Sequence, residues 1–219
     1  MSVRKVPFVN NEYYHIYNRG IDKREIFNES QDLNRFLQSM IEFNTIDPIG
    51  SIFENSFRKE KSLGSLTSKR DKPLIDIVCF CINPNHFHFI LTPIVDKGIE
   101  KFMHRLGTGY TKFFNGKYLR SGALFQGTFK SIHINSNEYL LHVSAYINLN
   151  SRVHKLRNEA PKFFNRSSWE EYTSENYNGF CKKDIVLDQF NNVSEYKKFA
   201  ESSLNDILER KEMGKFLLE

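Results

Sequence analysis

Apolar and polar positions between residues 76 and 92 form the clearest pattern in the chain. An apolar run at 77–82 leads into the turn residues Asn-Pro-Asn, and polar and apolar residues then alternate from His86 to Leu91. This pattern predicts a β-hairpin with strands at 76–82 and 86–92. Because successive strand side chains point to opposite faces, His86 and His88 share one face of the second strand.

The predicted register of the hairpin decides where the cysteines point. A three-residue turn puts Ile82 opposite His86, so Cys79 and Cys81 lie on the face away from the histidines. Unless a bulge shifts the register, we expect no cysteine ligand beside His86. Cys181 is the third cysteine of the chain. Three cysteines without a Cys-x-x-Cys motif do not make a disulfide framework or a zinc ribbon.

Helical spacing of apolar residues predicts three helices in the first two thirds of the chain. They lie at 31–44, 98–118 and 136–149, and two further strands are predicted at about 13–18 and 129–134. Without the last helix the order is β-α-β-β-α-β, which is that of an antiparallel ferredoxin-like sheet. The sequence thus predicts an α+β fold, with an added C-terminal helix packed across the sheet face to which the histidines point.

The last predicted helix carries a second group of candidate functional residues. Asn135, with Glu138 three residues later, is typical of an N-cap and capping box. Tyr146 and Asn150 are four residues apart and therefore neighbours on one helix face, with His142 one turn before Tyr146. One helix can thus present a phenol, an amide and an imidazole to a single point. The alternative is a tyrosine that only packs, beside strand histidines that only form hydrogen bonds.

Composition and charge favour a globular protein with an anionic partner. The 219 residues are 40% apolar and 14% aromatic, and the formal net charge is +5. No Asp or Glu occurs from Lys101 to Asn137, which favours DNA over a merely solvated basic face. Tyr110, a rival candidate nucleophile, lies on the apolar stripe of its helix, and we expect it in the core. The candidate DNA-binding residues are Arg105, Lys112, Lys117, Arg120, Lys130 and Arg152.

Four separated blocks of residues agree with one family pattern. They are Tyr14-His15-Ile16-Tyr17-Asn18-Arg19-Gly20, Asn83-Pro84-Asn85-His86-Phe87-His88, Gly122-Ala123-Leu124-Phe125-Gln126-Gly127-Thr128-Phe129-Lys130-Ser131 and Tyr146-Ile147-Asn148-Leu149-Asn150-Ser151-Arg152-Val153. In order and spacing they resemble the single-tyrosine HUH transposases, most closely the REP-associated tyrosine transposases. The family often has Met at the place of Asn83 and proline at the place of Ser151, and neither departure removes a reactive group.

The resemblance implies a metal-dependent enzyme that cuts and rejoins single-stranded DNA next to a hairpin. Tyr146 would attack the scissile phosphate, retain a 5′-phosphotyrosyl link and release a 3′-OH, so rejoining needs no nucleotide cofactor. His86, His88 and Asn150 would hold a divalent ion, Mg2+ or Mn2+, because imidazole and amide oxygen suit these ions and leave positions open for phosphate and water. The resemblance allows a monomer or a homodimer.

The domain organisation predicted is an HUH transposase-like catalytic domain at residues 1–155 and an aromatic-rich appendage with a terminal helix at 156–219. The aromatics of the appendage either stack on unpaired bases or, more simply, cover apolar surface. The Ser- and Lys-rich segment at 58–72 is predicted to be a flexible basic loop that binds a DNA backbone or is only solvated.

Two other classes of protein remain open. One is a catalytically inactive or host-adapted DNA-hairpin-binding protein, and the other is an RNA-binding ferredoxin-like module that reads bases through aromatics on an open sheet face. Neither a signal peptide nor a run of about 18 apolar residues is present, so we expect a cytoplasmic protein without a membrane partner.

Overall fold

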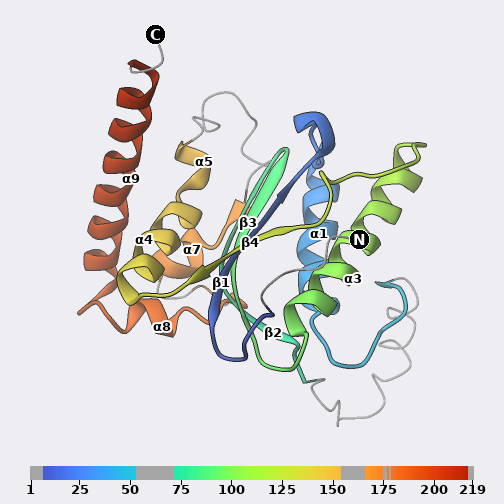
Figure 1. Cartoon of the computed structure of the whole chain (residues 1–219), viewed down its shortest axis with the longest axis horizontal. Helices are drawn as coiled ribbons and strands as arrows, with labels where there is room; N and C mark the ends of the chain where they lie inside the picture. Colours follow the sequence, from blue (N-terminus) through green and yellow to red (C-terminus); the bar gives the residue numbers. More distant parts are fainter. Residues whose placement is uncertain (1–6, 53–71, 154–165, 175–176, 178, 217–219) are drawn as a thin grey trace.

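The fold is built on one antiparallel sheet with strand order β4-β1-β3-β2-β5 (Figure 1). The computed structural model describes residues 7–52, 72–153, 166–174, 177 and 179–216. The α+β class and the ferredoxin-like arrangement of the first four strands are confirmed, and β5 extends the sheet beyond β2. The strands are β1 (Tyr13–Arg19), β2 (Ile75–Asn83), β3 (His86–Pro93), β4 (Lys130–Ile134) and β5 (Arg166–Ser167).

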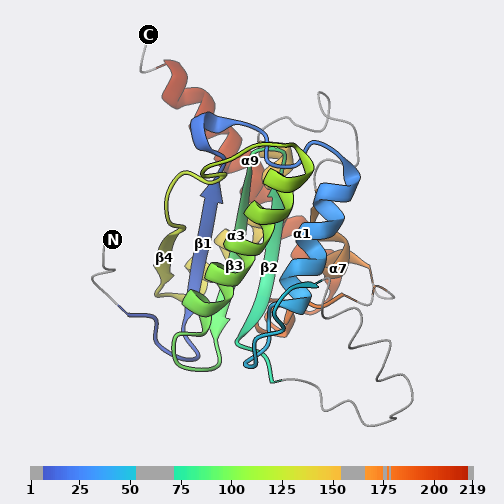
Figure 2. The same ribbon diagram turned by 90° about the vertical axis from the view of Figure 1, so that its right-hand side faces the viewer.

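Two long helices cover one face of the sheet, α1 (Ser30–Glu42) and α3 (Gly98–Lys117) (Figure 2). Their apolar stripes meet the sheet in a cluster that includes Phe36 and Phe102, both fully buried. Tyr110 lies in this cluster, where its hydroxyl donates to the carbonyl oxygen of Ile26 over 2.5 Å. The prediction that Tyr110 is a core residue is therefore confirmed.

The remaining helices gather on the opposite face of the sheet (Figure 1). Tyr172 and Tyr196, from the predicted appendage, are fully buried in one cluster with Val143 and Ile147. These described aromatics therefore cover apolar surface, and helices lie on both faces of the sheet. The helices on this face are α4 (Asn137–Asn148), α5 (Asn150–Val153), α7 (Trp169–Thr173), α8 (Asp184–Leu187) and α9 (Val193–Phe216).

Two predicted features fall outside the described residues. The basic loop at 58–72 does so except for Lys72, and the predicted domain boundary at 155 does so as well.

The β2–β3 turn differs from the prediction by one residue. Asn83 pairs with His86, so the turn contains two residues instead of three, and Cys81 lies opposite His88. This register is regular from Cys79 to Asn83 and places both cysteines in the cluster on the histidine face. The prediction that both cysteines point away from the histidines is wrong, because a slip of one residue exchanges the faces of a strand.

The short 3-10 helix η1 (Ile21–Lys23) and its flanks hold the tip of this hairpin. The carbonyl oxygen of Pro84 accepts from the backbone N–H groups of Ile26 and Phe27, and that of Asn85 accepts from Gly20. Backbone contacts thus fix the turn that precedes the two histidines.

Candidate functional site: a cavity between the histidine strand and a tyrosine helix

Cross-strand pairing gathers polar side chains on the sheet face covered by α4. Arg19 of β1 lies opposite His86 of β3, and Tyr17 lies opposite His88 on one side and Lys130 of β4 on the other. A cavity of about 470 Å³, called here the histidine–tyrosine cavity, opens on this face. Its lining residues are Tyr17, Asn18, Arg19, His86, His88, Gln126, Lys130 and Tyr146.

Tyr146 reaches the cavity from α4. Its ring centroid lies 5.7 Å from that of His88 and 6.4 Å from that of His15, with an edge-to-face geometry in both pairs. Burial raises the pKa of Tyr146 above the ordinary value of 10, and the nearby Asn150 amide lowers it in part. The phenol is therefore protonated at neutral pH, and its attack on phosphorus requires help with the developing charge.

Asn150 lies near this phenol although α4 ends before it. Leu149 leaves helical geometry at the C-cap, and α5 begins at Asn150, whose side chain is fully buried. At the other end of α4 the N-cap is Ser136, whose hydroxyl accepts from the backbone of Tyr139, in place of the predicted Asn135.

The His142 side chain does not point to the place that Tyr146 and Asn150 share. Its Nδ1 lies 3.2 Å from the Ser203 hydroxyl, and its ring packs against Phe199 of α9. The prediction that one helix presents phenol, amide and imidazole together is wrong for the imidazole, because α9 covers that part of the helix surface.

The tautomer of His86 follows from its neighbours. Asn85 donates from Nδ2 to the carbonyl oxygen of Lys23, which turns its Oδ1 toward His86 Nδ1 at 2.5 Å. Nδ1 therefore carries the proton, and Nε2 presents its lone pair. This Nε2 lies 3.3 Å from Oδ1 of Asn150.

His88 is held by a third histidine that the sequence analysis did not select. His15 Nε2 and His88 Nδ1 are 2.9 Å apart, and both side chains are buried. Burial lowers the pKa of His15 to about 4, so this ring stays neutral and one of its nitrogens can accept. The alternation of His15, Tyr17 and Arg19 along β1 is the signal in the sequence that could have identified this strand as part of the site.

The donor set fits a hard divalent ion held by imidazole and amide groups. Adjacent ligands of an octahedral ion are about 3.0 Å apart, since bonds of 2.0–2.1 Å meet at right angles, and His86 Nε2 and Asn150 Oδ1 have nearly this separation. Among the described residues, no group of three or more His, Cys, Asp or Glu side chains could hold a metal. Burial raises the pKa of Cys81 to about 12, so the nearby thiol stays protonated and is a poor ligand.

Two cations complete the cavity. Lys130 lines it from the edge strand, and Arg19 lines it from β1, with a buried Nε that has no hydrogen-bond partner in the described part of the chain. None of the described residues that line the cavity is acidic. A phosphate group is the anion that such a wall accommodates well.

Two other candidate DNA-binding residues make contacts within the α1–α3 layer. Arg105 donates to the backbone oxygens of Thr45 and Ile46 over 2.5 and 3.2 Å. Lys117 forms an ion pair with the fully buried Asp32 over 2.5 Å. These groups stabilise the helix layer on the far side of the sheet from Tyr146.

Arg120 and Arg152 also have protein partners. Arg120 donates to Asn115 Oδ1 over 2.7 Å, at the C-terminal end of α3. Arg152 lies over the ring of Trp169, 5.4 Å from its centroid, and 3.8 Å from Glu201. Lys130 is thus the one candidate among the six that lines the histidine–tyrosine cavity.

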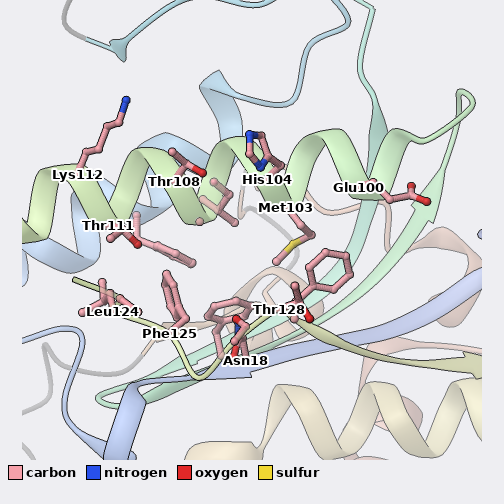
Figure 3. Close-up of a pocket in the computed structure, with 17 residues that line it drawn as sticks. Asn18, Glu100, Met103, His104, Thr108, Thr111, Lys112, Leu124, Phe125 and Thr128 are labelled. Carbon is pink, nitrogen blue, oxygen red and sulfur yellow. The ribbon is translucent and has the colours of Figure 1, made fainter. Parts of the chain in front are cut away.

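Lys112 borders a different cavity, of about 490 Å³, between α3 and the segment at 123–129 (Figure 3). Phenylalanines such as Phe87 and Phe125 form much of its wall, and Thr108 and Thr111 line it from the helix. The two cavities share Asn18 of β1. Lys112 thus lies at a cavity that Tyr146 does not line, and its role in DNA binding stays a prediction.

Comparison with known proteins finds a family model that matches part of the chain. The family model described as "Transposase IS200 like" matches residues 51–150, which include both histidines, Tyr146 and Asn150. This match supports the resemblance to tyrosine transposases that the four sequence blocks indicate. No curated protein matches the chain.

A solved structure shares the fold. It is a REP-associated tyrosine transposase bound to a REP hairpin, with 14% sequence identity and a TM-score of 0.50. The match covers 88% of this chain and 93% of that chain. No described helix is both long enough and apolar enough to span a membrane.

Proposed function

We propose that this IS200-like protein is a single-stranded DNA endonuclease and strand transferase that cuts near a hairpin through a 5′-phosphotyrosine. The observation that carries the proposal is the single cavity that Tyr146 shares with His86, His88 and two cations. The hairpin-bound transposase with the same fold supports a hairpin substrate.

The chemistry is an in-line exchange at phosphorus. The Tyr146 oxygen forms the new bond to phosphorus, the bond to the 3′ oxygen breaks, the phenol proton leaves to solvent, and the 3′ oxygen takes up a proton. Arg19 and Lys130 hold the non-bridging oxygens and offset the charge that develops on them. Attack by the 3′-OH on the phosphotyrosine reverses the step, so strand joining needs no nucleotide.

His86, His88 and Asn150 would hold a divalent ion, Mg2+ or Mn2+. When bound, such an ion polarises the phosphate and stabilises the charge on its oxygens. His15 orients the His88 imidazole through its Nδ1 atom, and Asn85 orients the His86 imidazole in the same way. Metal-binding histidines usually have such a partner on the ring nitrogen that does not bind the metal.

A denaturing gel tests the proposal. Labelled single strands with a hairpin, incubated with the protein and Mn2+, should give a covalent adduct that EDTA prevents. Binding of the hairpin without an adduct would instead favour the inactive DNA-binding protein. The RNA-binding alternative lacks support, because α4 and α9 cover the sheet face that such a module leaves open.

A further inference from the structure

Asn83 connects two of the proposed metal ligands, His86 and Asn150. Its Nδ2 donates to Asn150 Oδ1 over 2.6 Å and lies 3.0 Å from His86 Nε2. Asn83 is fully buried and pairs with His86 in the last rung of the hairpin. Its amide is therefore held directly beside the site.

The three atoms form a triangle with edges of 2.6, 3.0 and 3.3 Å. Ligand atoms on one face of an octahedral Mg2+ or Mn2+ site are about 3.0 Å apart, for metal–ligand bonds of about 2.1 Å. The triangle of Asn83, His86 and Asn150 thus has the size of one such face.

The lone pair of His86 Nε2 makes the amide orientation depend on the metal. Asn85 fixes the proton on Nδ1, so Nε2 has one lone pair, to which the Asn83 N–H group points. A cation that takes this lone pair must displace that N–H. Rotation of the amide by about 180° exchanges N for O without changing the shape of the side chain, so a close-packed site permits it.

We propose that Asn83 is a further ligand of the divalent ion and binds through Oδ1 after this rotation. The inference rests on the proposed function, because it requires the same ion. The rotation turns Nδ2 toward Cys81 Sγ, a weak acceptor that now lies 3.7 Å from Asn83 Oδ1. With His86, His88 and Asn150, the protein then supplies four ligands, and two octahedral positions stay open for phosphate and water.

Mn2+ titration of the full chain without DNA, followed by electron paramagnetic resonance, tests this ligand. Asn83→Leu keeps the approximate shape and removes both polar atoms, whereas Asn83→Asp offers oxygen in either orientation. We expect Asn83→Leu to weaken Mn2+ binding about tenfold or more, as loss of metal-site partners generally does. Asn83→Asp should bind Mn2+ more tightly than the wild type.

An effect of the opposite sign on the Mn2+ affinity of Asn83→Leu overturns the proposal. If the Asn83 amide only competes with the ion, Asn83→Leu will bind Mn2+ as tightly as the wild type or more tightly. Circular dichroism in EDTA shows whether this variant folds, and if it does not, equal or weaker binding by Asn83→Asp decides against the ligand. A wild type that binds no Mn2+ overturns the metal-dependent function as well, whereas an EDTA-sensitive adduct with unimpaired Asn83→Leu overturns only the role of Asn83.

Discussion

Replacement of His15 by leucine tests whether a partner behind His88 sets the metal affinity. The two rings share a hydrogen bond of 2.9 Å, and their side chains are 7% and 9% exposed, so water cannot easily replace the lost partner. A buried polar nitrogen without a partner costs about 1–3 kcal/mol. Loss of such an orienting partner typically lowers metal affinity about 10- to 100-fold.

The assay is Mn2+ titration, with urea unfolding in EDTA to measure stability separately. His15→Gln places an acceptor near the position of the lost Nε2 and should restore most of the affinity, whereas the shorter His15→Asn should not. His15→Gln and His15→Leu both remove the ring contact with Tyr17. The difference between their Mn2+ affinities therefore measures the contribution of the hydrogen bond. Wild-type affinity in His15→Leu, or equal rescue by Asn and Gln, would refute the reasoning.

The remaining predictions concern the nucleophile, the DNA surface and the helix layer. Tyr146→Phe should abolish the covalent adduct on a denaturing gel and preserve DNA binding. Tyr110→Phe should keep the adduct and lose about 1 kcal/mol of stability, because it loses its buried hydrogen bond. Loss of the adduct in Tyr110→Phe but not in Tyr146→Phe would show that Tyr146 is not the nucleophile. Lys130→Glu should weaken binding of single-stranded DNA and lower the slope of log affinity against log salt concentration by about 0.7 or more, with a smaller effect for Lys112→Glu. Equal effects of the two substitutions would contradict a DNA path through the histidine–tyrosine cavity. Asp32→Ala should cost about 3 kcal/mol in urea unfolding, because its fully buried carboxylate pairs with a lysine, and a loss below about 1 kcal/mol would contradict this.

Local patterns in the sequence are sufficient for much of the fold. The predicted hairpin strands, 76–82 and 86–92, correspond to β2 and β3, and Tyr110 is in the core as its helical stripe indicates. These features depend on the periodicity of side chains along one element, which the sequence displays directly. For the same reason His86 and His88 share a face, whereas Tyr146 and Asn150 belong to two successive helices, α4 and α5.

The rest of the site depends on which residues lie opposite one another. A turn of two residues instead of three brings Asn83 beside His86, and pairing of β1 with β3 brings Arg19 and His15 to the site. Packing of α9 takes His142 away from it. A shift of one residue in a strand exchanges its faces at little local cost, so only tertiary packing, which buries one face and excludes the other, decided these neighbours.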